Sequence, residues 1–406
     1  MSLPFFIAKR HLFNRHKIGY ISFISIISTV GLAVGIAALI ITISILNGFE
    51  NVLKEKLIGF DAHIRLRLFN GQTFESSDEI EKRLWVIPQI REIVPYVHSA
   101  VMVRYKSETD GVVMEGLTEE NIMKTLDIQR FLKSGSVTFY TDDGHDGIVI
   151  GRKLANMLGA GLGDRIYLFV LHSPSETSTR PRVGTFTITG IYESGIADYD
   201  DIFVYTSLEA AQNIMNLGTQ FSGFQIILDN PYDAGDVAEQ INSTLGYPYH
   251  AMSWLDLHMN LFEWLRVQRL PILIVFSLIA LVAIFNIISS LMMIVIEKTK
   301  DIGVLKSMGV NRRQTGRIFL IEGSIIGIAG TLLGFMIALI LSWVQMRFSI
   351  ISIPEDVYFM SQLPIQLEPD YFLIIGACAI VCSMIATIYP AFKAIRLTPT
   401  EAIRYE

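Results

Sequence analysis

The residues best suited to chemistry in this sequence form two short acidic runs. Residues 142–147 (DDGHDG) bring carboxylates and a histidine together, and residues 198–201 (DYDD) bring further carboxylates together. Such side chains can bind a metal ion, and carboxylate oxygens are ligands that calcium prefers. Asp and Gly at this density more often build turns, because Asp bonds to nearby backbone groups and Gly accepts a positive φ. The sequence therefore favours two solvent-exposed turns over metal sites.

Motifs for nucleotide or covalent chemistry are missing from the sequence. It has no G-x-x-x-x-G-K-[ST] loop to cradle the phosphates of ATP, no H-E-x-x-H and no C-x-x-C. The GLGD of residues 161–164 fits a tight turn between a helix and a strand. Cys378 and Cys382 fall in an apolar segment, where small side chains suit helix packing better than redox chemistry or metal binding. We therefore predict a chain without catalytic residues, metal or bound cofactor.

Apolar segments dominate the elements that must position any functional site. Of 406 residues, 51% are hydrophobic and 18% charged, whereas about 25% of the residues of a soluble domain are charged. Four stretches without Asp, Glu, Lys or Arg are long enough to cross a bilayer, which takes about 20 residues. The transmembrane helices predicted from them cover residues 18–46, 270–296, 318–346 and 371–392. This composition excludes a soluble enzyme, and two cysteines are too few for a disulfide-rich secreted module.

The distribution of Lys and Arg predicts how the chain is oriented in the membrane. The short segments 1–17, 297–317 and 393–406 are rich in Lys and Arg, whereas residues 347–370 contain one Arg and four acidic residues. We therefore expect both termini and the 297–317 loop in the cytoplasm. Residues 47–269 then form a large polar insert on the other side, where acidic residues outnumber basic ones and argue against nucleic-acid binding.

The insert is predicted to be a mixed α/β domain, because segments with period-two alternation occur between helical ones. A hairpin over residues 98–117 is expected to turn at 108–111 (ETDG), since Asp-Gly is a strong turn signal. Ser207 is expected to cap a helix over 207–215. Further strands are predicted at 62–68, 147–151, 165–172, 183–192, 201–205 and 222–228, and further helices at 152–158 and 233–245. The predicted fold is an α-helical membrane protein with four transmembrane helices and this extracytoplasmic α/β domain between helices 1 and 2.

A ten-residue polar segment, 173–182 (SPSETSTRPR), joins two predicted strands of the insert and is longer than an ordinary hairpin loop. One interpretation is a plain surface loop. The other is a projecting arm that touches a partner. Pro174 and Pro181 would limit its flexibility, while Arg180 and Arg182 would offer hydrogen bonds to an acidic or carbonyl-rich surface.

The cytoplasmic loop is predicted to contain a short amphipathic helix at residues 298–309 (KTKDIGVLKSMG). Its apolar stripe would consist of Ile302, Leu305, Met308 and Gly309, and its charged rim of Lys298, Lys300 and Lys306, with Asp301 and Gly303 between them. A helix of this kind suits docking into a groove of a partner protein. The alternative is a helix that lies on anionic lipid.

The predicted spans contain glycines four residues apart, which let helices approach closely. The pairs are Gly31 with Gly35, Gly323 with Gly327 and Gly330 with Gly334, and ordinary packing is the favoured role. Glu322 lies at the cytoplasmic edge of the third span. We expect its carboxylate to reach the interface and pair with a nearby Lys or Arg.

Several segments resemble the MacB/FtsX class of ABC permeases, and within it the LolC/LolE family of membrane subunits of the lipoprotein-releasing system. The resemblance covers nearly the whole chain. Residues 297–309 (EKTKDIGVLKSMG) resemble the coupling helix of the class. The other segments that carry the resemblance are 6–10 (FIAKR), 20–28 (YISFISIIS), 46–50 (LNGFE), 150–166 (IGRKLANMLGAGLGDRI) and 389–406 (YPAFKAIRLTPTEAIRYE).

The resemblance implies an ABC transporter in which a separate, LolD-like cytoplasmic ATPase dimer binds ATP and Mg²⁺ and contacts the coupling helix. Two permease protomers, either a LolC/LolE-like pair or two copies of this chain, would enclose an apolar cavity between their first and second spans. Lipoproteins would enter it from the outer leaflet of the inner membrane of a Gram-negative bacterium. They would leave to a LolA-like periplasmic carrier, docked through a loop at the position of residues 173–182.

Apolar side chains at the outer ends of the first two spans suit the acyl chains of such a cargo. The candidates are Leu46, Phe49, Leu261, Phe262, Leu265, Leu270 and Ile274. The alternative is that they face membrane lipid or a neighbouring helix, since apolar residues are the default in a span. Two other functions stay open at this point, MacB-like efflux of small molecules or peptides and FtsX-like signalling to a cell-wall hydrolase.

Overall fold

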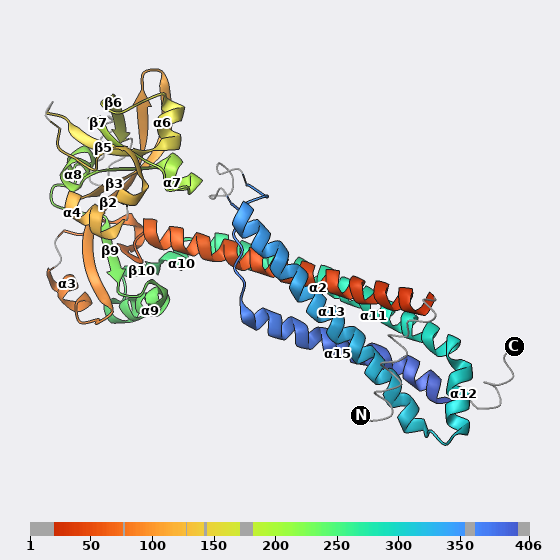
Figure 1. Cartoon of the computed structure of the whole chain (residues 1–406). Coiled ribbons are helices and arrows are strands. Elements are labelled where there is room, and N and C mark those ends of the chain that lie inside the picture. Colours follow the sequence, from red (N-terminus) through yellow and green to blue (C-terminus); the bar gives the residue numbers. More distant parts are fainter. Residues whose placement is uncertain are drawn as a thin grey trace. The chain divides into compact units, whose positions relative to one another are not determined.

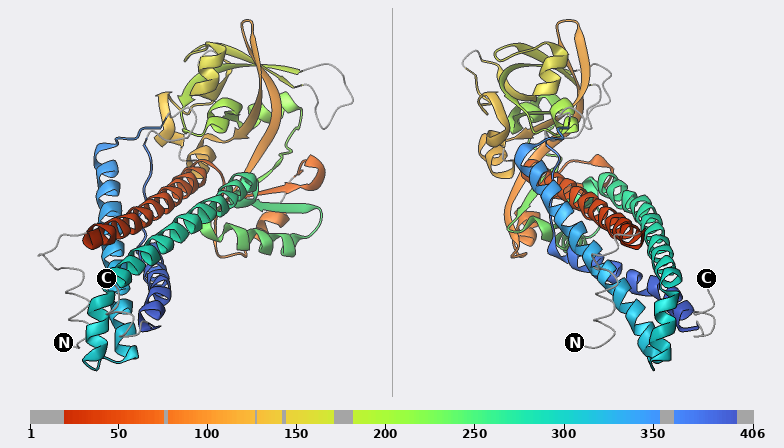
Figure 2. Two further views of the ribbon diagram at one scale, coloured as in Figure 1. Left: turned by 90° about the vertical axis from the view of Figure 1, so that its right-hand side faces the viewer. Right: turned by 45° about the vertical axis from the view of Figure 1, so that its right-hand side comes forward.

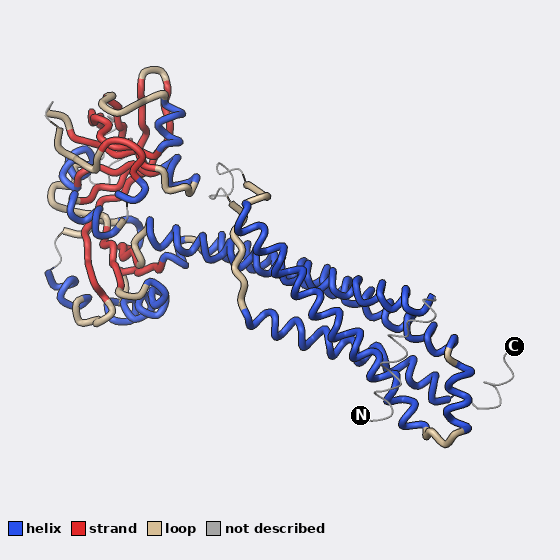
Figure 3. Tube along the Cα trace, viewed as in Figure 1, coloured by secondary structure: helices blue, strands red, loops and turns tan. Residues whose placement is uncertain are grey.

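The computed structural model describes residues 20–75, 78–126, 128–141, 144–170, 182–353 and 362–396. The chain divides into two compact units. Of the described residues, the helical unit contains 20–50, Leu265–Ser352 and 362–396, and the α/β unit contains those within Asn51–Trp264. Figure 1 labels most of the elements, and Figure 3 colours helices blue and strands red.

Four helices of the described residues are long and apolar enough to cross a membrane, as predicted. They are α2 (Tyr20–Phe60), α11 (Met259–Glu297), α13 (Arg312–Phe348) and α15 (Pro369–Arg396), and α12 (Thr299–Ser307) links α11 to α13. Both α2 and α11 are longer than the apolar runs that predict them. A helix continues through polar residues that favour it, so the apolar run sets only its minimum length.

Glycines let α13 pack closely against both α15 and α2. A Cβ atom on Gly323 would lie 1.7 Å from the Cγ2 atom of Thr387 in α15, and one on Gly334 would lie 2.9 Å from the Cβ atom of Ile36 in α2. Side chains at these positions would therefore push the helices apart. The predicted packing role of these glycines is confirmed.

Glu322 also lies in α13, but its side chain is fully buried within the helical unit. The prediction that it reaches the membrane interface is therefore wrong for this structure.

The strands of the α/β unit form one sheet in which the long strand β2 takes part twice. They are β1 (Ile64–Leu68), β2 (Ile90–Tyr105), β3 (Glu108–Leu117), β4 (Leu132–Gly135), β5 (Asp146–Gly151), β6 (Arg165–Val170), β7 (Arg182–Tyr192), β8 (Phe203–Ser207), β9 (Gly223–Leu228) and β10 (Tyr249–Ser253). The first part of β2 pairs with β9 and completes an antiparallel sheet in the order β10-β1-β9-β2. We call these four strands the open sheet.

The second part of β2 pairs with both β3 and β6, so that the strands β2-β3-β8-β5-β7-β6 close into a barrel. The strand β4 extends it at β7. Figure 2 shows β2 and β3, in orange, running side by side as a long hairpin. The strand β2 therefore joins the open sheet to the barrel.

Short helices cover these strands, and those predicted at residues 152–158, 207–215 and 233–245 are among them. They are α3 (Asp78–Leu84), α4 (Glu119–Thr125), α5 (Ile128–Phe131), α6 (Arg152–Leu158), α7 (Ala197–Ile202), α8 (Leu208–Met215), α9 (Ala234–Leu245) and α10 (Trp254–Leu257), with 3₁₀ turns at Phe69–Gly71 and Pro231–Asp233. Ser207 caps α8 as predicted, since its hydroxyl accepts a hydrogen bond from the Ala210 N–H at 3.0 Å. This bond satisfies one of the free N–H groups at the helix start.

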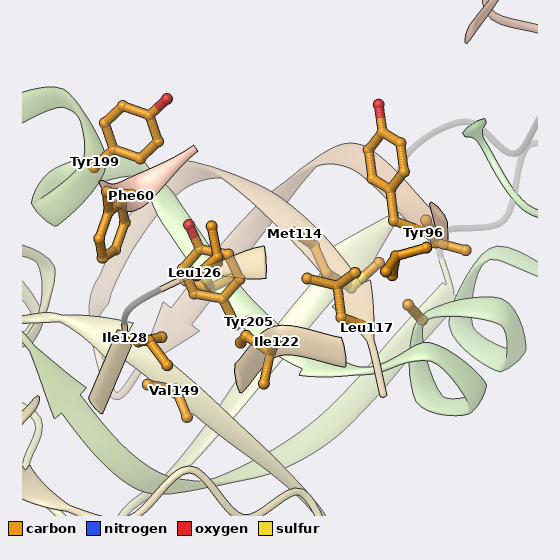
Figure 4. Packing of buried hydrophobic residues seen from close by; sticks show 14 of the residues in the cluster. Phe60, Tyr96, Met114, Leu117, Ile122, Leu126, Ile128, Val149, Tyr199 and Tyr205 are labelled. Atoms are coloured by element: carbon orange, nitrogen blue, oxygen red, sulfur yellow. The ribbon is translucent and has the colours of Figure 1, made fainter. Parts of the chain in front are cut away.

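The core of the α/β unit is aromatic around the end of α2. Phe60, the last residue of α2, is fully buried, and its ring lies 5.2 Å from that of Tyr192 and 5.3 Å from that of Tyr199. Figure 4 shows Phe60 beside Tyr199 at one end of the cluster that also contains Tyr96 and Met114. Burying a side chain of this size stabilises the fold by about 1.5–3 kcal/mol, so Phe60 anchors this end of α2 in the core.

The hairpin turn lies three residues earlier than predicted. It is formed by Lys106, with a φ of 53°, and Ser107, whereas the Asp110-Gly111 pair lies within β3. The strand pairing joins Val101 to Val112, and this register places the Asp-Gly pair in the ladder. Cross-strand packing of apolar residues therefore outweighs the local turn preference.

The acidic run 198–201 is not the exposed turn that the sequence favours. It lies in α7, and the strand expected at 201–205 runs over Phe203–Ser207 instead. Asp200 is buried, and its carboxylate accepts hydrogen bonds from the Ser194 N–H at 2.7 Å and the Gly195 N–H at 3.0 Å. Asp200 thus closes a local loop of the backbone. Of the other run, Asp142 and Asp143 lie outside the described residues.

Candidate functional site

The predicted amphipathic helix exists as α12, and its own chain covers one side of it. Ile302 and Gly303 are buried, and Ile302 belongs to the apolar core of the helical unit. The Lys306 ammonium donates hydrogen bonds to the carbonyl oxygens of Ala394 at 3.2 Å and Ile395 at 2.9 Å, in the last turn of α15. Burial lowers the pKa of Lys306. These contacts hold α12 against the end of α15.

The outward side of α12 differs from the predicted stripe. Met308 and Val304, four residues apart, are 78% and 53% exposed, while Leu305 is only half-buried. Lys300, Asp301 and Gly309 are also exposed, and Lys298 pairs with Asp301 at 3.1 Å. Val304 is a member of this exposed side that the sequence stripe omitted. We call Val304, Met308 and Lys300 the α12 outer face.

The seven candidate cavity residues do not share one environment. Leu261 and Phe262 pack against the core of the α/β unit, where the Phe262 ring lies 5.6 Å from that of Trp254, and Leu265 is buried. Leu46 and Phe49 are half-buried in α2. Leu270 and Ile274, four residues apart in α11, are both 62% exposed. These two residues present open apolar surface at the start of the second span.

A salt bridge joins the two helices close to these positions. The Arg269 guanidinium in α11 lies 2.5 Å from the Glu50 carboxylate in α2. Glu50 directly follows Phe49 in α2, and Arg269 directly precedes Leu270 in α11. Both partners are partly exposed, and pairs of this kind contribute about 0–1 kcal/mol, so we assign it to local helix placement.

The candidate carrier loop is described only at its base. Val170 ends β6, and Arg182 begins β7 and pairs with Val170 in the ladder. The base of the loop is thus held by the barrel. Pro174, Arg180 and Pro181 lie outside the described residues, so their role stays a prediction.

A cluster of charged side chains that sequence reasoning missed lies inside the α/β unit. The Arg65 guanidinium donates to Asp61 Oδ1 from Nε at 2.9 Å and from Nη2 at 2.6 Å, and from Nη1 to Glu115 Oε1. All three side chains are buried, with at most 4% of each exposed. We call Asp61, Arg65 and Glu115 the buried triad.

Four neutral or weakly basic side chains complete the hydrogen bonding of the buried triad. Tyr199 donates from its hydroxyl to Asp61 Oδ2 at 2.6 Å, and His258 Nε2 lies 3.5 Å from the same oxygen. Gln225 donates to Glu115 Oε2 at 3.2 Å, and His98 Nδ1 lies 3.1 Å from Glu115 Oε1. Every carboxylate oxygen of the triad therefore has a partner, as buried charges require.

These contacts keep both carboxyl groups ionised. Burial alone would raise the pKa of Asp61, but the Arg65 charge and the hydrogen bonds from His258 and Tyr199 hold it well below its usual value. Burial would also raise the pKa of Glu115, but the Arg65 charge and the hydrogen bond with His98 lower it. Each lowered pKa stabilises the folded state at pH values above the pKa of the unfolded state, which is 3.8 for Asp61 and 4.5 for Glu115. This stabilisation is lost as the pH falls below these values. The triad is thus fully ion-paired at neutral pH.

Sequence reasoning missed this cluster because a strand with period-two alternation is expected to bury only every second residue. Ile64, Arg65 and Leu66 are all buried, since other elements cover both faces of the strand. A buried position for Arg65 needs Glu115, which is 50 residues away in the chain. The usable signal is an arginine inside a predicted strand that has apolar residues on both sides.

Fold and sequence comparisons together define the class of protein. A family model for a MacB-like periplasmic core domain matches residues 25–244, more than half of the chain, and one for an FtsX-like permease C-terminal region matches residues 273–399. With four apolar helices and an α/β domain between the first two, the chain is a multi-pass ABC-transporter permease of the MacB/FtsX type. It is a transmembrane subunit and not an enzyme.

Curated relatives specify the family. The lipoprotein-releasing system transmembrane protein LolC of Xylella fastidiosa is 31% identical over 411 residues, which cover 98% of both chains. LolC of Neisseria meningitidis is 26% identical over 100% of both chains, and LolE of Haemophilus influenzae is 27% identical over 99% of both. The chain belongs to the LolC/LolE family of lipoprotein-releasing permeases, as its sequence motifs indicated.

Proposed function

We propose that this chain is the permease subunit that extracts lipoproteins from the inner membrane of a Gram-negative bacterium and passes them to a periplasmic carrier. The observation that carries the proposal is similarity to LolC and LolE proteins over essentially the full length of the chain. MacB-like efflux and FtsX-like signalling are less well supported, because these full-length relatives are named for lipoprotein release.

The energy for extraction would come from a separate cytoplasmic ATPase dimer of the LolD type, which would bind ATP and Mg²⁺. Each CH₂ group moved from lipid to water costs about 0.8 kcal/mol, so several acyl chains need both work and an apolar recipient. The α12 outer face is our candidate for the ATPase contact. Its exposed Val304 and Met308 offer apolar anchors, and Lys300 offers a charge at their edge.

The acyl chains would be held between the first two spans of this chain and those of a second protomer, either a LolC/LolE-like partner or another copy. Leu270 and Ile274 are the strongest candidates because they combine apolar character with exposure. Phe49 is half-buried, and its neighbour in sequence, Glu50, forms a salt bridge with Arg269. The buried Leu265 and the core-packed Leu261 and Phe262 are more suited to holding α11 in place.

Photocrosslinking tests this cavity. A photoreactive amino acid at Ile274 or Phe49 should capture lipoprotein in membranes that contain the transporter. The matched control is Leu373 in α15, which is 73% exposed and also lies near the outer end of a span in the predicted topology. We expect much weaker capture at Leu373. Equal capture at all three positions would mean that Ile274 and Phe49 merely face the lipid phase.

The carrier contact is proposed for residues 173–182. The supporting observation is that Val170 and Arg182 hold the base of this segment in the barrel. Pro174 and Pro181 would reduce the entropy lost on docking because proline fixes φ. Arg180 and Arg182 would supply the polar contacts.

A further inference from the structure

The buried triad lies where separate parts of the α/β unit meet. Asp61 directly follows the last residue of α2, Arg65 belongs to β1 of the open sheet, and Glu115 belongs to β3 of the barrel. His98 lies in β2 next to the position where that strand changes its partner from β9 to β3. The triad therefore connects the end of α2, the open sheet and the barrel.

The second long helix reaches the same cluster. His258 immediately precedes α11, and its Nε2 atom lies 3.5 Å from Asp61 Oδ2 and 3.3 Å from the Tyr199 hydroxyl. Tyr199 belongs to α7, which packs on β5 of the barrel. Asp61 thus contacts groups at the end of α2, at the start of α11 and on the barrel.

Stability alone does not account for charges at this place. Removing charges from water is costly, and apolar side chains of similar volume often stabilise a core as well as or better than a buried ion pair. Buried charges differ from apolar side chains in being directional. Arg65 holds its planar fork between two carboxylates, and this geometry tolerates little displacement of either one.

We propose that the buried triad, with Tyr199 and His258, is a positioning element that holds the ends of α2 and α11, the open sheet and the barrel in one fixed arrangement. This proposal rests on the proposed function, because the consequence lies in transport. When α2 and α11 move during the ATPase cycle, the domain would follow as one body. Without the triad the open sheet and the barrel would move separately, and ATP would be hydrolysed with less cargo released.

A neutral variant of nearly unchanged shape tests the proposal. Asp61→Asn/Arg65→Met/Glu115→Gln removes all three charges and retains most of the volume. In the reconstituted complex we expect normal ATP hydrolysis and about tenfold less lipoprotein released per ATP, within the range found for substitutions between coupled sites. The matched control, Glu79→Gln/Arg83→Met, removes an exposed ion pair in α3 and should release normally.

A distance measurement provides a readout that a purely stabilising role would not change. Spin labels would be attached at two exposed positions, Val86 near the start of β2 and Met157 in α6. They would be placed in the full chain with Cys378 and Cys382 replaced by serine. We expect a narrow distance distribution in the parent protein and a broader one in the neutral variant at equal fractions of folded protein. Unchanged distributions together with normal release per ATP would overturn the proposal.

Tyr199→Phe provides a second variant if the neutral variant does not fold. It removes one hydroxyl that donates to Asp61 and leaves the ring in the core. For this variant we expect a smaller loss of lipoprotein release per ATP and a smaller broadening of the distance distribution. If the folded variant behaved like the parent protein in both measurements, the positioning role would be contradicted. A parent protein that releases no lipoprotein would instead contradict the proposed function, and the distance measurement would still test the triad.

Discussion

The variant Arg65→Met is expected to lower the free energy of unfolding of the α/β domain by about 3–5 kcal/mol, because removing one partner of a buried ion pair leaves uncompensated buried charge. In this chain Asp61 and Glu115 would face each other without the guanidinium that joins them. Denaturant unfolding of the purified full chain in detergent measures the effect. Trp254, buried in the α/β core, provides a fluorescence signal for this domain.

Arg83→Met is the matched control for Arg65→Met. Arg83 also pairs with a carboxylate four residues away, Glu79, at 3.0 Å, but both side chains are exposed. Exposed pairs contribute about 0–1 kcal/mol, so this variant should unfold almost like the parent protein. Equal losses of stability in the two variants would show that the charges of the triad are not buried as described.

Charge on the α12 outer face is expected to weaken the association with the ATPase strongly. Val304→Asp and Met308→Asp place a carboxylate on a surface that we propose to be buried in an apolar groove. Loss of a central interface contact costs about 2 kcal/mol or more, or about 30-fold in affinity. Copurification of the ATPase with each variant in detergent measures this effect.

Met308→Leu is the control on α12, since it keeps an apolar side chain of similar volume and should bind the ATPase normally. Gly303 is unsuited to this test because it is buried in its own chain, and a large side chain there would disturb folding. Normal copurification with both Asp variants would favour the alternative that α12 lies on anionic lipid.

The four membrane helices and most of the α/β order were predictable because they depend on local patterns. A long apolar run gives a helix across the membrane whatever it packs against, and alternation marks the half-buried strands. Pairing across the chain was not predictable in this way. The hairpin turns at Lys106 rather than at Asp110-Gly111 because the register joining Val101 to Val112 decides where the strands end.

The candidate sites show the same limit. The amphipathic pattern of residues 298–309 predicted a helix, but not that Ile302 faces its own chain while Val304 and Met308 face outward. An apolar stripe gives the period of a helix and not the identity of what covers it. Arg65 is the extreme case, since only its distant partner Glu115 makes a buried arginine acceptable.

The most direct test of the central claim is lipoprotein release from proteoliposomes that contain this chain, its second protomer, the ATPase and a triacylated lipoprotein. We predict that adding ATP transfers the lipoprotein to a soluble periplasmic carrier, and that Val304→Asp and Met308→Asp abolish the transfer. Lipoprotein that stays in the vesicles while the complex hydrolyses ATP and the carrier is present would contradict the assignment of this chain to lipoprotein release.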